Sequence, residues 1–550
     1  MGLSAEQIMT LELQHGGTVV GAPGPPRDVT MARRGMVASA HHLACDVGLE
    51  MLRHGGNAID AAVAAAALLT VVEPRNGHLG GDTFMLIHLA AEGRVVALNG
   101  SGAAPAAATL DVYRDLGGIP DDGLLSSTVP GTVSCWALAL ERYGTRTMEE
   151  VFAAAIEYAD RGVPVTARLH RLLSLDAPTY RKVPDSAKVF LPGGDVPAVG
   201  AVFRQPALAH SLRRIAAGGR DEFYSGRLTD EMVQSSGQHG GLFTVEDFAS
   251  HQTEDLEPVA IEYRGYTVFE QPPVSQGIIV LLALNILREF DLPGMGHGST
   301  ASIHLMLEAL KLAFEDRLRY LGDPRHVEIP LSMLLSTDHA RAQAQRISLE
   351  HARPLSMPDN GHPDTTSLVA ADEAGNMVSY IHSLFSGAGV VLGDTGVLMN
   401  SRLLNFNLDE GHPNCLAPGK RPVHTLNPYL VQKDGEAVLV GGTPGAHWQV
   451  QTNLQILSNV IDFGLDPQRA IEAPRFTVGD QLDVGNPTVK IESRVGERVV
   501  KELRDLGHDI EVIGPWDSGG AVQLIARDPL SGMCRGATEV RRPGNTVVGL

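Results

Sequence analysis

The sequence Asp364-Thr365-Thr366-Ser367 leads into a strand-like run at residues 368–371 and then a turn at residues 372–376. A threonine in this position becomes a catalyst only if the bond before it is cut. Once Thr365 is an N-terminus, its own α-amine can take the proton of its hydroxyl. An α-amino group has an unperturbed pKa of about 7.7 to 8.0, so it can act as a base near neutral pH. The stretch therefore predicts a nucleophile and its base in one residue, made by cleavage between Asp364 and Thr365.

Two alternatives stay open on these residues alone. A Thr-Thr pair beside a strand is also what β-propensity produces, with no catalytic meaning. Thr366 carries a second hydroxyl and competes with Thr365 as the nucleophile. The motifs elsewhere in the chain favour the catalytic interpretation and the first threonine.

The chain after Thr365 resembles the small subunit of the γ-glutamyltransferase family, whose members are self-processing N-terminal-nucleophile hydrolases. The motifs that carry this resemblance are Gly375-Asn376, Ser383, Gly389, Gly396-Val397-Leu398-Met399-Asn400, Pro418-Gly419-Lys420-Arg421-Pro422 and Gly442-Thr443-Pro444-Gly445. Elsewhere they are Gly55-Gly56-Asn57-Ala58, Val71-Val72-Glu73-Pro74, Gly80-Gly81, Val129-Pro130-Gly131, Phe223-Tyr224-Ser225-Gly226, Leu321-Gly322-Asp323-Pro324 and Ser518-Gly519-Gly520-Ala521. Because the matches keep their order along the chain, it is identified as a member of this family.

The composition limits the class of protein. The 550 residues carry a net charge of −20, spread without a polyanionic tail or a block of Lys and Arg. Nucleic acids and anionic membranes bind to basic patches on proteins, so we expect neither as a partner. The longest apolar tract, residues 58–72, contains Asp60 and is too short for a typical membrane-spanning helix.

The cysteines and the first residues of the chain indicate the cellular compartment in which we expect the protein. The cysteines are scattered with no CxxC pair, so we expect them to be reduced and mostly buried. The start of the chain has no positively charged residues followed by an apolar segment, so no secretory signal is visible. We therefore expect a cytoplasmic enzyme. Met31 is an alternative start, just before the first family-like residues.

Apolar periodicity gives a coarse map of the elements. Helical spacing is clearest at residues 42–53, 58–72, 134–143, 148–161, 276–290 and 302–320. Strand-like runs lie at residues 84–87, 95–98, 266–269, 367–371, 377–381, 429–432 and 437–440. The resemblance implies an α/β (α+β) fold of the N-terminal-nucleophile hydrolase type, a four-layer αββα sandwich with two stacked, mainly antiparallel sheets.

The resemblance also divides the chain. We expect an N-terminal extension at residues 1–32, a large subunit at 33–364 and a small subunit at 365–550. After cleavage the two subunits would form one intertwined domain. The polar segment 350–363 is expected to be an exposed loop that swings away and opens the site.

The family's catalytic roles carry over to four residues. Thr365 attacks first the Asp364 carbonyl and later a substrate amide, and it passes the acyl group to water or an amine. Ser383 stands where the family has a threonine that bonds the nucleophile, although a strand serine can also be purely structural. Gly445 and Ala446 belong to the turn whose N–H groups form the oxyanion hole. Ala446 replaces a glycine but keeps its N–H, so we expect the oxyanion hole to survive if the turn has a backbone angle that alanine can adopt; a positive φ at Ala446 would count against it.

The substrate-binding positions depart from the family pattern. Ser101 replaces the arginine that clamps the substrate's α-carboxylate. The family's α-amine site is occupied here by Phe385, Arg402 and Asn405. His424 replaces a serine of the carboxylate site. An anionic partner for a substrate ammonium is therefore missing, and a cation has appeared.

The remaining candidates leave alternatives open. Thr425 keeps a hydroxyl beside the changed carboxylate site. Arg402 either binds an acid on the acyl group or pairs with Asp409 or Glu410 at the rim. Arg75 and His78 lie in a loop that the family places near the active site, and either is a substitute for the lost clamp or a surface residue.

We therefore expect a self-processing amidohydrolase or acyltransferase that acts on a small-molecule amide, similar to an oxamate amidohydrolase or a carboxyacyl amide acylase. The alternatives are a conventional γ-glutamyltransferase or glutathione hydrolase, and a non-catalytic binding protein on the same fold. None of the 21 histidines falls in an HxH or HExxH pattern, so we expect no metal, and no other cofactor. One expected assembly is a dimer of heterodimers.

Overall fold

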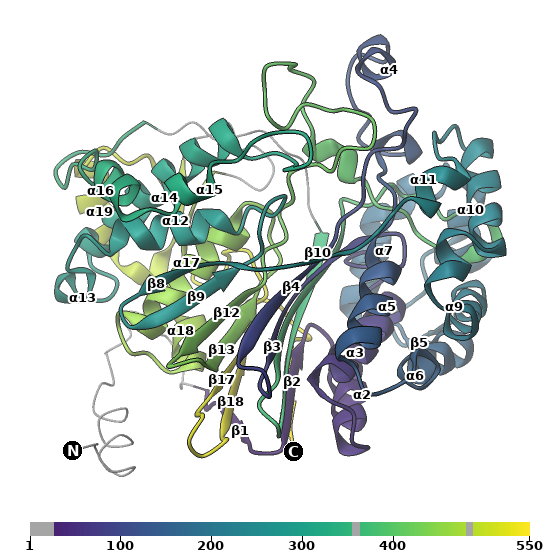
Figure 1. Cartoon of the computed structure of the whole chain (residues 1–550), viewed down its shortest axis with the longest axis horizontal. Coiled ribbons are helices and arrows are strands. Elements are labelled where there is room, and N and C mark those ends of the chain that lie inside the picture. The colour runs from purple at the N-terminus through teal and green to yellow at the C-terminus, as the bar shows by residue number, and fades with distance from the viewer. Residues whose placement is uncertain (1–26, 355–363, 480–487) are drawn as a thin grey trace.

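The computed structural model describes residues 27–354, 364–479 and 488–550. Two seven-stranded sheets stack face to face, and helices cover both outer faces (Figure 1). The four-layer αββα sandwich expected from the sequence is therefore confirmed. The other described strands form a three-stranded sheet (β14 Phe476–Val478, β15 Val489–Glu492, β16 Ile510–Ile513) and a two-stranded sheet (β5 Val163–Pro164, β6 Val202–Phe203).

The first sheet contains the expected nucleophile. Its strands lie in the order β19-β2-β10-β11-β3-β4-β7, and all neighbours are antiparallel. Their bounds are β2 Gly35–Ser39, β3 Asp82–Leu89, β4 Arg94–Gly100, β7 Glu254–Leu256, β10 Asp364–Asp372, β11 Met377–Phe385 and β19 Thr546–Gly549. Because β10 lies between β2 and β11, both expected subunits contribute strands to one sheet.

The second sheet carries the glycine turn. Its order is β1-β18-β17-β13-β12-β9-β8, again antiparallel throughout. The bounds are β1 Thr30–Ala32, β8 Val259–Tyr263, β9 Tyr266–Glu270, β12 Tyr429–Lys433, β13 Glu436–Gly442, β17 Gln523–Arg527 and β18 Cys534–Thr538. The turn at residues 442–446 follows β13 directly.

Helix α3 (Ala58–Val72) shows how the helices pack on the first sheet. All fifteen of its residues are buried, and Asn57 and Asp60 form a capping box at its start. Its many alanines let it lie close to its neighbours. The other helices on this side include α2 His42–Arg53, α5 Thr132–Tyr143, α6 Met148–Arg161 and α9 Pro206–Tyr224.

The outer face of the second sheet is covered by a second helix layer (Figure 1). That layer contains α12 Ile278–Leu287, α14 Thr300–Tyr320, α17 Trp448–Ile461 and α18 Pro467–Glu472. The remaining α-helices are α4 Leu110–Asp115, α7 Ala167–Tyr180, α8 Pro184–Phe190, α10 Arg227–Gln238, α11 Val245–Ala249, α13 Leu292–Met295, α15 Leu331–Leu334, α16 Thr337–Ala344 and α19 Glu497–Asp505. Short 3₁₀ helices are η1 Leu124–Ser126, η2 Pro192–Gly194, η3 Gly393–Thr395, η4 Arg402–Asn405 and η5 Ser493–Val495.

Most of the expected elements are present with small shifts at their ends. Three expected helices have the same bounds in the structure: 42–53, 58–72 and 148–161. Helix α12 begins at Ile278 rather than at residue 276, because the preceding residues are held in a loop. The N–H of Gln276 donates to the His424 carbonyl over 2.8 Å, and the Ser275 hydroxyl donates to the Leu426 carbonyl over 2.6 Å.

The inner faces of the two sheets form a separate core. Val369 and Met377 of the first sheet pack there with Leu430 of the second. Side chains alternate along a strand, so the same alternation turns Thr365 and Ser383 toward the second sheet. The expected nucleophile therefore faces the space between the sheets.

One expected segment boundary is corrected by the structure. Residues 30–32, assigned to the N-terminal extension, form β1 and pair with β18, so the fold begins before residue 33. Residues 1–26 and 355–363 lie outside the described residues. The described start of the expected loop is anchored, because the Ala352 N–H donates to the Leu506 carbonyl over 2.7 Å.

Two further expectations concern membranes and cysteines. Among the described residues, no helix has both the length and the apolar character that a membrane span requires. The cysteines, Cys45, Cys135, Cys415 and Cys534, are free and buried, as expected.

Leu430 tests the packing between the sheets. Leu430→Ala removes methyl groups that are fully buried in the inner core. We expect it to lower the free energy of unfolding by about 2–5 kcal/mol. Leu530 is 82% exposed, and Leu530→Ala is the matched control, with an effect within about 0.5 kcal/mol. Denaturant unfolding measures both, and equal midpoints for the two variants would contradict this packing.

Candidate active site

Thr365 and Ser383 meet where β10 and β11 pair near the start of β10. They pair directly across the two strands, and the Thr365 hydroxyl donates to the Ser383 Oγ over 3.2 Å. Ser383 Oγ also accepts the backbone N–H of Phe385 over 2.7 Å, which restrains its orientation. In the uncut chain Thr365 is 2% exposed and Ser383 is fully buried. The structure thus brings together the nucleophile and the assisting hydroxyl expected from the sequence.

Thr366 points the other way. It pairs with His382, and both side chains lie on the helix-covered side of the first sheet. There the His382 Nε2 donates to the His78 carbonyl over 2.8 Å. Burial lowers the pKa of His382 to about 4, so it is neutral near pH 7. The alternative nucleophile is therefore separated from Ser383 by the sheet itself.

The turn at residues 442–446 begins next to β10. Ser367, on the same face of β10, donates from its hydroxyl to the Gly442 carbonyl over 3.4 Å. Within residues 27–354, 364–479 and 488–550, the backbone N–H groups of Gly445 and Ala446 have no backbone acceptor. Two adjacent donors that are free to bind an oxygen are what an oxyanion hole requires.

The backbone of this turn is left-handed at Ala446. Gly445 has φ 133° and Ala446 has φ 47°, a region that costs a residue with a Cβ roughly 1–2 kcal/mol. Two bonds from α17 fix the turn: the Trp448 N–H donates to the Gly445 carbonyl over 2.8 Å, and the Gln449 N–H to the Ala446 carbonyl over 3.1 Å. Because N–H and C=O of a trans peptide point in opposite directions, the first bond turns the Ala446 N–H away from α17.

Asp82, which sequence reasoning missed, organises the other side of the site. It begins β3 directly opposite Ser383, so its side chain extends the row formed by Thr365 and Ser383. Its carboxylate accepts the Gly102 N–H over 2.8 Å, Arg402 Nε over 3.2 Å and His424 Nε2 over 3.1 Å. Asp82 therefore fixes two of the residues that the sequence placed in the binding set.

Arg402 is fully buried and does not lie at the rim. The alternative in which it pairs with Asp409 or Glu410 is wrong, because its ion pair is with Asp82. Glu410 pairs instead with Arg114 over 2.7 Å, at an exposed position. Proximity in the sequence suggests the wrong partners.

The Arg402 guanidinium is held on three sides. Its Nε donates to Asp82, its Nη1 donates to the Thr425 hydroxyl over 3.4 Å, and its central carbon lies 4.9 Å from the ring centroid of Phe385. The Nη2 group is buried and has no partner in the part of the chain that the structure describes. One charged donor is thus left to bind something else.

Burial and mutual contacts set the protonation states of Asp82, Arg402 and His424. Burial alone would raise the pKa of Asp82, but the hydrogen bond from His424 and the charge of Arg402 bring it below its ordinary value. Burial lowers the pKa of Arg402 to about 10 and that of His424 to about 4. Near pH 7 the cluster therefore contains one carboxylate, one guanidinium and a neutral imidazole.

Ser101 and Asn405 have structural contacts. The Ser101 hydroxyl donates to Asn99 Oδ1 over 2.6 Å. The Asn405 Nδ2 donates to the Val423 carbonyl over 2.9 Å, while its Oδ1 has no partner among the described residues. Both side chains are therefore held by hydrogen bonds within the protein.

Arg75 and His78 are also engaged elsewhere. Arg75 Nε donates to Asp176 over 2.5 Å. His78 Nδ1 accepts the Leu398 N–H over 3.1 Å, and burial lowers the pKa of His78 to about 3. A neutral, buried imidazole and a paired guanidinium do not replace the lost clamp.

One trio that the sequence patterns did not reveal has the residue types of a metal site. The ligand atoms of His304, Glu308 and His508 lie within 4.8 Å of one another. Protein groups already occupy them: His304 Nδ1 bonds with His508 Nε2 over 2.7 Å, His304 Nε2 donates to the Ser348 carbonyl over 2.7 Å, and Lys311 donates to Glu308 over 2.7 Å. Hydrogen bonding within the chain accounts for this trio.

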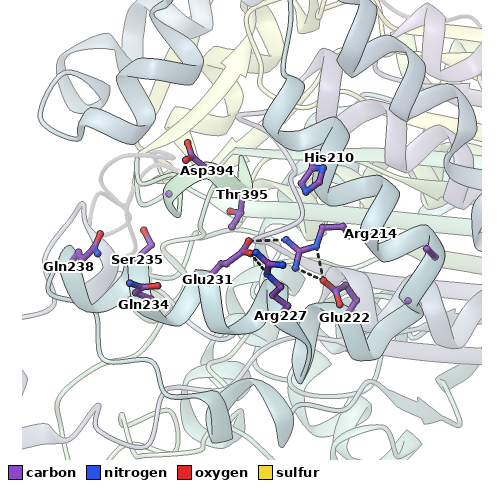
Figure 2. Close-up of a pocket in the computed structure, with 13 residues that line it drawn as sticks. His210, Arg214, Glu222, Arg227, Glu231, Gln234, Ser235, Gln238, Asp394 and Thr395 are labelled. Carbon is purple, nitrogen blue, oxygen red and sulfur yellow. Dashed lines mark hydrogen bonds and ion pairs between the residues drawn. The ribbon is translucent and has the colours of Figure 1, made fainter.

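A cavity of about 1040 Å³ opens between α9, α10 and η3 (Figure 2). Both arginines that line it form ion pairs inside it: Arg214 contacts Glu222 over 2.5 Å and Glu231 over 2.8 Å, and Arg227 contacts Glu231 over 3.2 Å. The residues that line it include none of the row that begins at Thr365. This cavity is separate from the site around Thr365.

Similar proteins were found for nearly the whole chain. It is 38% identical to the glutathione hydrolase-like YwrD proenzyme of Bacillus subtilis over 518 residues, 93% of this chain and 98% of that protein. It is 35% identical to the oxamate amidohydrolase proenzyme of Klebsiella pneumoniae over 523 residues, 94% of this chain and 98% of that protein.

A solved structure and a family model agree with these relatives. The structure of cephalosporin acylase from Bacillus halodurans matches with a TM-score of 0.89 and 36% identity, covering 96% of this chain and 98% of that one. The family model described as gamma-glutamyltranspeptidase matches residues 44–549. With this match and the shared fold, the chain belongs to the gamma-glutamyltranspeptidase family of amide-cleaving enzymes.

Proposed function

We propose that this chain is a self-processing amidohydrolase in which Thr365 is the nucleophile and the acyl group of the substrate carries an acid. The chemistry is supported by the pairing of Thr365 with Ser383 and by the N–H groups of Gly445 and Ala446, which have no backbone acceptor among the described residues. The observation that carries the specificity is the buried Nη2 of Arg402, which has no partner among the described residues.

Processing starts in the uncut chain. The Thr365 hydroxyl attacks the carbonyl carbon of Asp364, the C–N bond breaks, and the hydroxyl proton passes to the nitrogen, which leaves an ester and a free α-amine. Water then hydrolyses the ester. The products are residues 1–364, ending in the Asp364 carboxylate, and residues 365–550, beginning with Thr365.

The mature enzyme repeats the attack on a substrate amide. The α-amine takes the Thr365 hydroxyl proton as the oxygen attacks, and the N–H groups of Gly445 and Ala446 hold the negative oxygen of the tetrahedral intermediate. The α-ammonium then gives that proton to the leaving nitrogen as the C–N bond breaks, which leaves the acyl group as an ester on Thr365. Water or an amine then removes the acyl group from Thr365.

The acyl group is selected by charge and by an apolar surface. Arg402 has Nε and Nη1 committed to Asp82 and Thr425, so a substrate carboxylate would accept from Nη2. The ring of Phe385 under the guanidinium suits a short carbon chain. Oxamate, dicarboxylic monoamides and the carboxyacyl side chains of cephalosporins all combine these features, and the similarity to an oxamate amidohydrolase and a cephalosporin acylase supports this choice.

Two other functions, γ-glutamyl transfer and non-catalytic binding, fit the site less well. A γ-glutamyl substrate would bring an α-ammonium toward Arg402, and Asp82, the carboxylate beside it, already accepts three hydrogen bonds. The glutathione hydrolase-like relative keeps that substrate as the second candidate. A non-catalytic binding protein would have no need of Thr365 paired with Ser383, or of two adjacent amides that have no backbone acceptor among the described residues. A cytoplasmic location and a dimer of heterodimers remain predictions from the sequence.

The nucleophile is tested by three single variants. Thr365→Ala removes the hydroxyl, so we expect an uncut chain by intact mass and no amide hydrolysis. Thr365→Ser keeps a hydroxyl and should be cut, more slowly. Thr366→Ala is the matched control, because that side chain lies on the helix-covered face, and it should be cut and active. Cleavage that needs Thr366 and survives Thr365→Ala would overturn the assignment.

The role of Arg402 is tested with a variant that leaves no buried charge unpaired. Arg402→Met combined with Asp82→Asn should lower kcat/KM for succinyl p-nitroanilide by about 10–100-fold, because one charge-assisted hydrogen bond is lost. Butyryl p-nitroanilide has the same chain length and no acid, so its kcat/KM should change far less. Equal losses for the two substrates would show that Arg402 does not select an acid.

The neutral state of His424 makes stability depend on pH. Its folded pKa is about 4 and its ordinary value 6.5, so the unfolded chain takes up the proton first and stability declines as the pH falls from 6.5 toward 4. His424→Gln keeps a donor toward Asp82 and should reduce this slope by up to one proton, about 1.4 kcal/mol per pH unit. Denaturant unfolding at several pH values measures the slope. His351→Gln, at an exposed position, is the control, and an unchanged slope in His424→Gln would contradict the assignment.

A further inference from the structure

The loop before α12 crosses from the expected large subunit onto the small one. Ser275 forms an isolated parallel bridge with His424, and its hydroxyl donates to the Leu426 carbonyl over 2.6 Å. The backbone N–H of Gln276 donates to the His424 carbonyl over 2.8 Å. These bonds hold the Gln276 side chain between the segment 424–426 and the oxyanion turn.

The side chain of Gln276 uses all of its hydrogen-bonding groups there. It is fully buried, and its Nε2 donates to the Ala446 carbonyl over 3.1 Å and to the Thr425 carbonyl over 3.3 Å. Its Oε1 accepts from His447 Nδ1 over 3.1 Å. Burial holds the pKa of His447 well below its ordinary value, so the ring is neutral. The contact with the amide oxygen Oε1 assigns the ring proton to Nδ1.

The bond to Ala446 acts on the one strained non-glycine residue of the oxyanion turn. Ala446 has φ 47°, and the peptide on its N-terminal side is fixed by the Trp448 N–H. On its C-terminal side the Ala446 carbonyl accepts from Gln449 and from Gln276. Among the described residues, Gln276 is thus the only partner of that carbonyl from outside the turn's own helix.

We propose that Gln276 is a positioning residue: it holds Ala446 in the left-handed conformation that aims its N–H at the developing oxyanion, and it couples that turn to Thr425. The inference rests on the proposed function, because it assigns the support of the same oxyanion hole. A glutamine is required, since two carbonyl oxygens need two donors and His447 needs an acceptor. A carboxylate of the same size would place negative charge against both carbonyls.

The enzymatic test compares Gln276→Glu with Gln271→Glu. Gln271 is also a buried glutamine whose Nε2 donates to two carbonyls, those of Met85 and Leu98, each over 2.9 Å. Both carbonyls belong to strands of the first sheet and not to the oxyanion turn. We expect Gln276→Glu to lower kcat by about 10–100-fold with little change in KM, because an oxyanion donor acts mainly in the transition state. Gln271→Glu should leave kcat of the folded, processed enzyme unchanged. Intact mass gives the processed fraction for normalisation.

Two further readouts separate positioning from general damage. As the pH falls, the buried carboxylate of the variant takes up a proton and can donate it to one carbonyl, so the kcat deficit of Gln276→Glu relative to the parent should shrink.

Ala446→Gly removes the cost of a positive φ, so adding it to Gln276→Glu should recover kcat about tenfold or more. A loss that is independent of pH and identical in both backgrounds would overturn the proposal.

The parent, the two single variants and the double variant also give a result that does not depend on activity. If Gln276 restrains a strained Ala446, the Tm loss caused by Gln276→Glu should be smaller in the Ala446→Gly background, which a double-mutant cycle detects. An inactive parent with this coupling would mean that the proposed function fails while the positioning contact stands. An active, Thr365-dependent parent with no coupling in kcat or Tm would mean that the role of Gln276 is wrong.

Discussion

The pairing of Thr365 with Ser383 across β10 and β11 is the contact on which the rest of the site depends. A slip of one residue would turn Thr365 toward the helices and bring Thr366 to the inner face. The register is held from both sides, because β10 also pairs with β2 and β11 with β3. Burial of Val369 and Met377 between the sheets requires the same register. The packing of the sandwich and the geometry of the site are therefore set by one hydrophobic pattern.

Asp82 and Arg402 add a fixed charge to this frame. A buried ion pair loses most of its Coulomb energy to desolvation, so it contributes little to stability. Its effect here is geometric: the carboxylate and the Phe385 ring hold the guanidinium in one orientation, and within the described part of the chain its Nη2 has no partner. In the proposed function, this preorganised cation takes the place of the arginine that the family has at the Ser101 position.

Local sequence signals predict the elements well where local contacts define them. Helices α3 and α6 begin at capping boxes, which involve residues three apart, and their bounds agree with the prediction to the residue. The fold class comes from the resemblance, since periodicity alone does not choose how sheets stack. The predicted start of β10 is three residues late, because only pairing with β11 extends the strand to Asp364.

Contacts between distant residues cannot be predicted in this way. Sequence proximity pairs Arg402 with Asp409 or Glu410, whereas its partner Asp82 lies 320 positions away. Apolar spacing places Gln276 at the start of a helix, because nothing near it shows that it contacts Ala446. The signal that the sequence does contain is chemical: a cation placed among apolar and hydroxyl-bearing site residues needs a buried counter-charge, and the start of β3 carries one.

The central claim is that cleavage before Thr365 makes the nucleophile. It is tested most directly by incubating the purified protein with a slowly hydrolysed, acid-bearing anilide, quenching in acid and measuring the mass of each chain. If Thr365 is the nucleophile, the small subunit of residues 365–550 will be heavier by one acyl group, and peptide mapping will place that group on Thr365. An uncut chain of 550 residues, or an acyl group on any other residue, would contradict it.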